Sequence, residues 1–410
     1  MSVPQPLQSA PRVVPLRGGR QPLATMAAIL GEMLRSLLGA NARQMAPALQ
    51  KVRQIAEATP HERGIGAPPC RGRHHRQQLA IFLNMKHTHR AAVLSVGSAL
   101  PATIRTNDDP IFAWLREHQP AGSDLFKGLE RRRVLCAPQT VEDLVHDACS
   151  QALHNGHVAP QDIDLIMGAA SVSDWVAPNG LALVHQKLGL PAHCRVLPLN
   201  SDYTTYLDAL KLAQDLVTCG TARHVLVACG NNWTQHVDYH EAVALAAGDG
   251  AGAALVGPTR RDSDWRIVDW ANDTQTSWYG AFRMAQRPCP DGHWSTPLMT
   301  LDAQTGQTAF KEFGLKVVPQ VALALLKRHG IAAADITLLT HQSSLVVQQA
   351  WQEAIQPGHY PSTLAEFGDM VSSSVAVNLA HVWHDIPTRH VVLLGVGMEM
   401  HATAVLLSRQ

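Results

Sequence analysis

The chain has 410 residues, a formal net charge of +1, and a composition that is 46% hydrophobic and 16% charged. This length exceeds one typical domain, so two domains or one duplicated unit are expected. The near-zero net charge argues against electrostatic binding to nucleic acid, and no apolar run is long enough to predict a membrane-spanning helix. The seven cysteines show no CxxC pair, which indicates free thiols in a reducing, cytoplasmic setting.

Residues 1–85 differ in composition from the rest of the chain. They contain eleven Arg and Lys residues against three Glu and no Asp, and their ends are rich in Pro and Gly. The pattern is not that of a secretory signal, and serine is too scarce for a transit peptide. We expect a basic, mostly disordered extension. Two alternatives are a true start of the protein at Met85 and a basic arm that docks a partner.

From Met85 onward, predicted strands and helices alternate. Thr140 is expected to open the first long helix and Gly156 to close it. Alternation of this kind predicts βαβ units and a mostly parallel sheet. The predicted strands cover residues 91–101, 162–171 and 223–231, the predicted helices cover 140–156, 179–190 and 203–217, and a helix-like segment followed by a strand covers 240–258.

Residues 200–220 read as the junction between a strand and a buried helix. Ser201 and Asp202 are N-cap candidates and Gly220 ends the helix. Unpaired N–H groups and the positive end of the helix dipole meet at such a junction, where enzymes often place an activated nucleophile. The nucleophile would be Ser201, Asp202 or Tyr203, or none. The buried stripe is predicted from apolar residues at helical spacing, namely Tyr203, Tyr206, Leu207, Leu210 and Val217.

The chain repeats itself. Residues 152–171 are similar to 325–344, and residues 221–230 are similar to 387–397 in the same order. The repeat predicts two similar α/β halves, residues 86–258 and 259–410, packed around a pseudo-dyad. We expect a functional site where strand ends from the two halves meet.

Two motifs that suggest a cofactor or a metal are rejected. The glycine-rich segment 246–257 lies after a helix-like stretch and before a strand, the reverse of a dinucleotide-binding motif. His236 and His240 have a spacing that suits zinc, but no third ligand stands at a diagnostic distance. Neither a cofactor nor a metal ion is therefore expected.

His341 and Asp369 are the candidate catalytic pair. His341 follows the predicted buried strand 338–340 directly, and Asp369 lies between a glycine and small residues that lead into a helix. If both face the 200–203 junction of the other half, they form a nucleophile–base–orienter set with Ser201.

Residues 90–408 resemble the thiolase-like condensing enzymes, in particular the ketoacyl-ACP synthase III branch. The resemblance implies an α/β thiolase fold, five αβαβα layers from two duplicated βαβαβαββ halves, and either a homodimer or a heterodimer with a paralogue. It also implies acyl transfer from an acyl carrier protein or CoA to a small-molecule acceptor, in fatty-acid-like or specialised metabolism. The matching stretches are VGSALPATIRTNDDP, GLERRRV, DIDLIMGAAS, residues 188–231, GDGAGAALV, LLTHQSS and FGDMVSSS.

The resemblance fails at the nucleophile. The family carries a cysteine at the start of the central helix, whereas an ungapped alignment places Tyr203 there and a one-residue slip places Asp202 there. His341 corresponds to the family's base. Asp369 stands in place of the family's asparagine, a change shared by some acyltransferases of this branch. A carboxylate beside the histidine would make it a stronger base towards an acceptor alcohol.

Three further positions bear on the substrate. Ser344 and Val346 replace the family's asparagine and phosphate-binding arginine, which weakens the case for CoA and favours a carrier-protein donor. The oxyanion turn at 395–401 contains Gly397, with Met398 where the family has glycine. A backbone N–H could still act as the oxyanion donor in a narrower pocket.

Two hypotheses follow. In the first, the chain is an acyltransferase that uses Ser201 as nucleophile, or that transfers directly with His341 as base. In the second, Tyr203 fills the pocket of a degenerate subunit, which pairs with an active paralogue or holds an acyl carrier.

Overall fold

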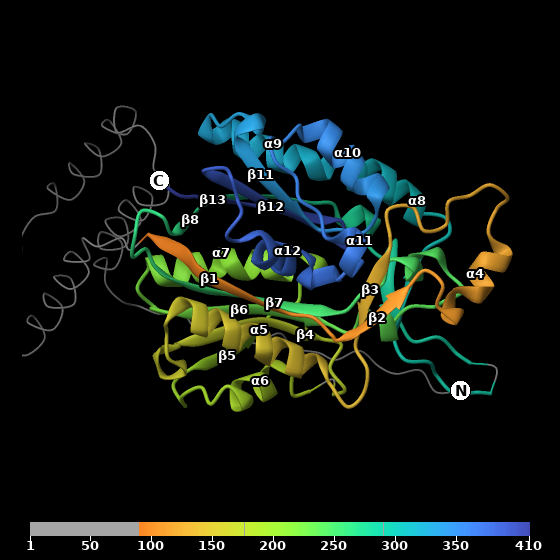
Figure 1. Cartoon of the computed structure of the whole chain (residues 1–410), viewed down its shortest axis with the longest axis horizontal. Coiled ribbons are helices and arrows are strands. Elements are labelled where there is room, and N and C mark those ends of the chain that lie inside the picture. Colours follow the sequence, from red (N-terminus) through yellow and green to blue (C-terminus); the bar gives the residue numbers. More distant parts are fainter. Residues whose placement is uncertain (1–89, 176, 290) are drawn as a thin grey trace, which may run out of the picture. The chain divides into compact units, whose positions relative to one another are not determined.

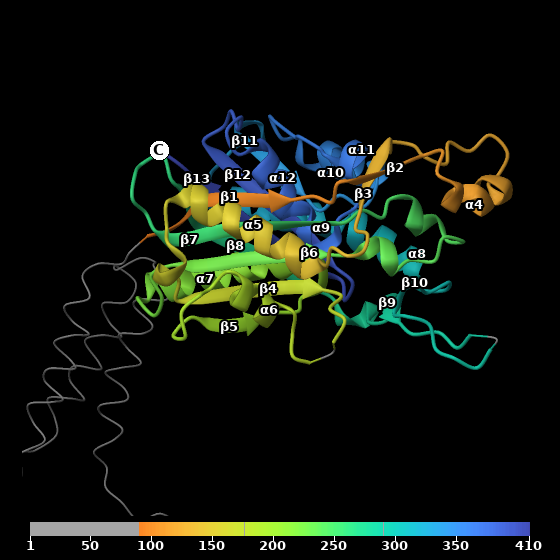
Figure 2. The same ribbon diagram turned by 60° about the horizontal axis from the view of Figure 1, so that its bottom comes forward.

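The computed structural model describes residues 90–410 except 176 and 290, and these residues form one compact unit. The extension predicted for residues 1–85 lies outside the described part. Within it, helices and sheets alternate in five layers, which Figure 1 shows from α9 and α10 at the top to α5 and α6 at the bottom. A second view shows α5 and α6 in front of the strands of the first half (Figure 2). The predicted αβαβα thiolase architecture is confirmed.

The first half contributes five strands to one nine-stranded sheet. β4 pairs in parallel with β5 and β6, whereas β7 runs antiparallel to both β6 and β1. Helices α5 (Val141–Gly156) and α6 (Leu181–Lys187) cover its outer face. In spatial order the strands are β1 (Ala91–Ala99), β7 (Gly250–Pro258), β6 (Val225–Asn231), β4 (Leu165–Ser171) and β5 (Arg195–Pro198).

The second half repeats this order with four strands. β11 and β12 are parallel, and β13 runs antiparallel to both β12 and β8. Helices α9 (Val317–His329) and α10 (Leu345–Ile355) cover the outer face. The predicted boundary at 258–259 falls between β7 and β8. β1 pairs antiparallel with β8, so the strands of the two halves form one continuous sheet, and a division into two domains stays a prediction. The strands are β8 (Trp265–Thr274), β13 (His401–Ser408), β12 (His390–Gly397) and β11 (Ile336–Thr340).

The prediction of a mostly parallel sheet is wrong. Parallel pairing is limited to β4–β5, β4–β6 and β11–β12, and the remaining pairs of the large sheet are antiparallel. For β12 and β13, the reason for antiparallel pairing is the short connection between the two strands. β12 ends at Gly397 and β13 begins at His401, and so short a link permits a hairpin but no crossover helix.

The repeated segments fold alike. α5 and α9 each end in a left-handed residue, and each is followed by a 3-10 turn and then by β4 or β11. Thr140 caps α5 in a capping box, as predicted. The residue with positive φ, however, is His157 rather than Gly156. Gly156 serves close packing instead, because a Cβ there would lie 2.5 Å from Leu255.

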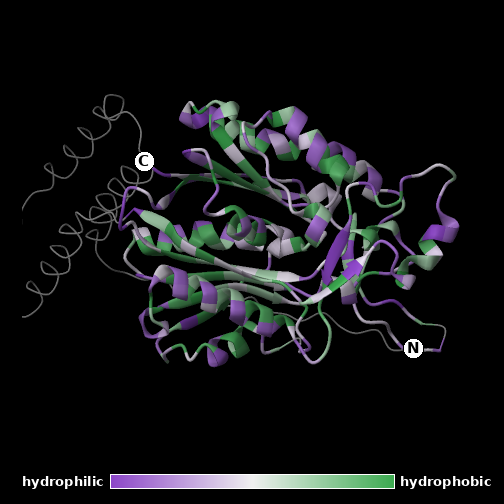
Figure 3. Cartoon of the chain, in the orientation of Figure 1, coloured by the Kyte–Doolittle hydropathy of each residue, from purple (hydrophilic) through white to green (hydrophobic). Residues whose placement is uncertain are grey.

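The middle layer consists of α7 (Thr205–Thr218) and α12 (Ser374–Val382), packed between the strands of the first half and those of the second half (Figure 1). Four members of the predicted stripe, Tyr206, Leu207, Leu210 and Val217, are buried on α7. Tyr203 is not part of the α-helix, because it lies in a preceding 3-10 turn, Asp202–Thr204. Figure 3 shows the hydrophobic strands inside and the polar outer faces of the helices.

Shorter elements complete the described part. The helix-like segment before Gly248 forms only a 3-10 turn, Ala242–Leu245. None of the described helices is both long and apolar enough to span a membrane. The other elements are β2 (Thr103–Thr106), α4 (Ala113–His118), β3 (Arg131–Val134), β9 (Phe282–Ala285), β10 (Leu298–Leu301), α8 (Gly306–Ala309), a π-helical turn (Phe310–Leu315), α11 (Leu364–Phe367) and 3-10 turns at Pro110–Phe112, Pro160–Asp162, Trp233–Gln235, Thr276–Trp278, Ala333–Asp335 and Val371–Ser373.

Candidate active site

The structure brings His341 and Asp369 together. His341 follows β11, and its backbone N–H donates to the carbonyl of Leu394 on β12 at 2.8 Å. Asp369 lies before α12, where its carboxylate accepts from the backbone N–H of Val371 at 2.8 Å. The two side chains are buried, at 2% and 6% residue exposure, and 3.9 Å separates Nε2 of His341 from Oδ1 of Asp369.

This geometry differs from a Ser–His–Asp triad. In such a triad the carboxylate holds the ring nitrogen that points away from the nucleophile. Here Asp369 faces Nε2 of His341, and Nδ1 is buried without a hydrogen-bond partner in the described part of the chain. A separation of 3.9 Å is too long for a direct hydrogen bond, so one polar group of a ligand can contact both side chains.

Burial controls the charge of Asp369. It raises the pKa of this carboxyl above the usual value, against the opposing effects of His341 and of hydrogen bonds from Val371 and Ser374. A carboxyl in this environment holds its proton to higher pH than an exposed one. The pair therefore combines a buried imidazole with a carboxyl that is easily protonated.

Asp369→Asn is expected to stabilise the protein at neutral pH. Because the folded pKa of Asp369 is raised, ionisation destabilises the fold, and this cost develops as the pH rises from about 4, the unfolded value, through the folded pKa. Urea unfolding across this range should show that the free energy of unfolding of the variant exceeds that of the wild type by an amount that grows as the pH rises. At acid pH the two free energies should be equal. A pH-independent difference would contradict this account.

Tyr203 forms an aromatic wall against His341. The two rings are stacked, with centroids 5.2 Å apart and an interplanar angle of 14°. The phenol donates to Sδ of Met299 at 3.9 Å, not to the imidazole. Burial, followed by the charges of Asp369 and Asp202, raises the pKa of Tyr203 well above its ordinary value. The phenol is therefore protonated and is not activated as a nucleophile.

Ser201 belongs to a different set of side chains. Its backbone N–H donates to Oγ1 of Thr205 at 3.0 Å, and its side chain lies close to Asp208. Asp208 faces His401 of β13, with 3.6 Å between Oδ2 and Nε2. Ser201 does not line the cavity that contains His341. The geometry therefore gives no support to the predicted set of Ser201, His341 and Asp369.

His341, Asp369 and Tyr203 line a cavity of about 590 Å³, which we call the acyl cavity. Its volume lies in the range typical of small-molecule sites. Ser344, Gly397 and Met398 also line it, and Lys127 and Lys311 add two cations that the sequence analysis overlooked. The remaining walls are mostly apolar, including Leu125, Leu129, Val243, Leu245, Phe282, Met299, Leu301, Phe310, Val347, Trp351, Val396 and Met400.

Two of the predicted pocket residues have structural partners. The hydroxyl of Ser344 accepts from the backbone N–H of Val347 at 3.3 Å and caps α10. The carboxyl of Asp202 accepts a hydrogen bond from the backbone N–H of Met398, although burial and the neighbouring Glu399 raise the pKa of Asp202 to about 7. An oxyanion role for this N–H would therefore compete with Asp202.

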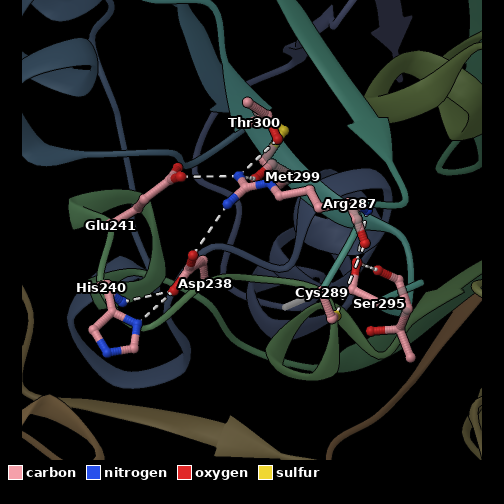
Figure 4. A network of polar contacts seen from close by, with 9 residues as sticks. Asp238, His240, Glu241, Arg287, Cys289, Ser295, Met299 and Thr300 are labelled. Atoms are coloured by element: carbon pink, nitrogen blue, oxygen red, sulfur yellow. Dashed lines mark hydrogen bonds and ion pairs between the residues drawn. The ribbon is translucent and has the colours of Figure 1, made fainter. Parts of the chain in front are cut away.

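An arginine holds Met299 against Tyr203. Arg287 donates from Nη2 to Oε1 of Glu241 at 2.9 Å and to the carbonyl of Met299 at 3.3 Å, and from Nη1 to Asp238 at 3.1 Å (Figure 4). These contacts join the segment after β6 to β10. They position the thioether that accepts from the phenol.

The rejected cofactor and metal motifs have other roles. The glycines at 250 and 252 lie in β7, so no helix follows them. Nδ1 of His236 contacts the carbonyl of Pro297 at 2.9 Å, and Nδ1 of His240 contacts Asp238 at 2.8 Å. Among the residues that the structure describes, no group of His, Cys, Asp and Glu could hold a metal ion.

Comparisons with known proteins agree with the fold. The sequence profile of the 3-oxoacyl-[acyl-carrier-protein (ACP)] synthase III family matches residues 199–275. The chain is 27% identical over 301 residues to beta-ketoacyl-[acyl-carrier-protein] synthase III of Caldanaerobacter subterraneus, covering 70% of this chain and 88% of the relative. It is 26% identical over 317 residues to the 2-heptyl-4(1H)-quinolone synthase subunit PqsC of Pseudomonas aeruginosa, covering 71% of this chain and 88% of that relative.

Solved structures show the same architecture. The structure of 3-oxoacyl-(acyl carrier protein) synthase III, FabH, from Pseudomonas aeruginosa superposes with a TM-score of 0.69 at 20% identity, over 78% of this chain and 98% of that one. The priming beta-ketosynthase of the R1128 polyketide pathway superposes with a TM-score of 0.68 at 23% identity, over 78% of this chain and 96% of that one. Profile, relatives and fold agree, and together they support the ketoacyl-ACP synthase III branch of the thiolase-like superfamily as the family that this chain resembles.

Proposed function

We propose that the chain is an acyltransferase that moves an acyl group from a carrier to a small-molecule acceptor without a covalent acyl-enzyme. The observation that carries the proposal is the buried His341–Asp369 pair, 3.9 Å apart, in a cavity with mostly apolar walls. The apolar walls suit an acyl chain. Neither of the two candidate nucleophiles Tyr203 and Ser201 is activated beside the pair, since Tyr203 is protonated and Ser201 does not line the cavity.

The chemistry follows from the space between the two side chains. An acceptor hydroxyl or amine that contacts Nε2 of His341 loses its proton to the imidazole as it attacks the thioester carbon. The new C–O or C–N bond forms, the C–S bond breaks, and the departing thiolate takes the proton from the imidazolium. Asp369, when ionised, stabilises the imidazolium.

The donor is proposed to be an acyl thioester on acyl carrier protein or on CoA. Lys127 and Lys311 line the acyl cavity, and ammonium groups pair with phosphate, which both donors carry. Relatives of the chain are named as synthases acting with acyl carrier protein, which supports the same donor class. A homodimer or a heterodimer with a paralogue remains the expected assembly.

Thiol release from short- and medium-chain acyl-CoA and acyl-ACP, measured with a panel of alcohols and amines, tests direct transfer. The wild type is expected to turn over without an acyl adduct by intact mass. Ser201→Ala is expected to keep the rate within about twofold, because Ser201 lies outside the cavity. An adduct on the wild type that Ser201→Ala abolishes would establish a covalent route instead.

A non-catalytic subunit is the second candidate. Two observations favour it: the ring of Tyr203 covers His341, and one relative is named as a synthase subunit. This candidate predicts no thiol release with any donor, together with co-purification of a paralogue that carries the family's cysteine.

A further inference from the structure

A second cavity, of about 520 Å³, adjoins the acyl cavity. Tyr203, Trp233, Phe282 and Met398 line both cavities, whereas His341 lines only the acyl cavity. We call the second one the polar cavity, because its lining adds a set of charged and polar side chains, namely Asn200, Asp202, Asn231, Asn232, His236, Arg283, Ser372 and Glu399.

Two carboxyl groups meet in the wall of the polar cavity. Asp202 comes from the turn before α7, and Glu399 comes from the turn between β12 and β13. They hydrogen bond to each other, and burial, the hydrogen bond and the charge of Glu399 raise the pKa of Asp202 to about 7. Two carboxyl groups share a hydrogen bond only while one is protonated. Near neutral pH the pair therefore carries at least one negative charge.

Two other polar groups of the cavity lack partners. The hydroxyl of Ser372 and the indole N–H of Trp233 are buried, at 6% and 3% residue exposure, and have no hydrogen-bond partner in the described part of the chain. Oε2 of Glu399 is likewise buried and lacks a donor there. Buried polar groups without partners are rare in folded proteins. Together they indicate a ligand that offers both a donor and an accepting oxygen.

The rest of the lining favours a cation. The rings of Tyr203, Trp233, Tyr279 and Phe282 line the cavity, and aromatic faces attract ammonium groups. The cavity also has one arginine, Arg283, whose charge is already balanced. Its Nη1 donates to Oδ2 of Asp302 at 3.3 Å and to a backbone carbonyl at 2.9 Å.

His236 adds a potential acceptor. Its Nδ1 lies 2.9 Å from the carbonyl of Pro297. Because a carbonyl only accepts, Nδ1 carries the hydrogen, and in the neutral ring Nε2 keeps a lone pair. The lining thus offers acceptors and aromatic faces to a positively charged group.

We propose that the polar cavity binds a protonated organic amine that also carries a hydrogen-bonding oxygen. The ammonium group binds at Asp202 and Glu399, and the oxygen satisfies Ser372 or Trp233. Binding of this ligand is separate from acyl transfer, since it requires neither His341 nor Asp369, and it would also hold for a subunit without catalytic activity.

Calorimetric titration of the full chain with three matched probes tests the proposal. Tyramine has the ammonium group, tyrosol replaces it with a neutral hydroxyl, and 4-hydroxyphenylacetate replaces it with a carboxylate. Tyramine is expected to bind at least tenfold more tightly than either of the others. Glu399→Gln and Asp202→Asn should each weaken tyramine binding about tenfold or more and leave tyrosol binding within about twofold.

Asp215→Asn is the matched control, because Asp215 is an exposed carboxylate of α7 that pairs with Lys211 outside the cavity. Its tyramine affinity should equal that of the wild type. Circular dichroism verifies that each variant folds. Equal binding of tyramine and 4-hydroxyphenylacetate by the wild type, undiminished tyramine binding by both cavity variants, or no tyramine binding at millimolar concentration would each overturn the proposal.

Discussion

His341→Ala is expected to lower the rate of acyl transfer by roughly 10²–10⁴-fold, the usual contribution of a general base. The imidazole is the candidate base that lines the acyl cavity beside Asp369. Alanine leaves the acceptor without a group to take its proton, while the apolar walls still bind the acyl chain. The loss should therefore appear in kcat more than in KM for the acyl donor.

The assay is thiol release at saturating donor and acceptor, with the fold verified by circular dichroism. His240→Ala is the control, because His240 is exposed and contacts Asp238 rather than the acyl cavity. It should retain the wild-type rate. A His341→Ala protein with wild-type kcat would remove the imidazole from the mechanism, whereas equal losses in both variants would indicate damage to the fold.

Tyr203→Cys is expected to convert the protein into one that forms a covalent acyl adduct. Residue 203 lies in the turn that leads into α7, beside His341. A thiol at the start of a helix and close to a histidine has a lowered pKa and reacts as a thiolate. The wild-type phenol has the opposite shift, because burial raises its pKa far above the usual value.

Intact mass after incubation with acyl-CoA measures the adduct. The wild type should show none, and the variant should approach one acyl group per chain. Tyr203→Ala is the matched control, since it removes the ring that lines both cavities without supplying a nucleophile. An adduct on Tyr203→Ala would indicate another acylated residue. An unmodified but folded Tyr203→Cys would mean that the donor does not reach the helix start.

Much of the fold was predictable because it depends on neighbouring residues. The capping box at Thr140, the stripe on α7 and the repeat of helix, turn and strand before β4 and β11 are all local patterns. Strand direction was not predictable to the same extent. The antiparallel pairing of β13 with β12 depends on a connection of three residues, 398–400, which the helix–strand alternation does not reveal.

The candidate site was predicted in part for a similar reason. His341 and Asp369 were identifiable because each follows a buried segment and precedes small residues. The partners of Ser201 could not be identified from the sequence. Ser201 and Tyr203 are two residues apart in a tight turn, so their side chains project in different directions. Ser201 meets Asp208, and Tyr203 meets His341.

By itself, the sequence determined the order of the elements, the duplication and the candidate base with its carboxyl neighbour, because periodicity, caps and strand ends are encoded locally. Only the tertiary structure decided what surrounds them. The stacking of Tyr203 on His341 and the pairing of Asp202 with Glu399 join residues from opposite halves of the chain. Contacts of this kind depend on how the two halves pack around the central helices. The spacing of residues along the chain does not indicate which side chains this packing brings together.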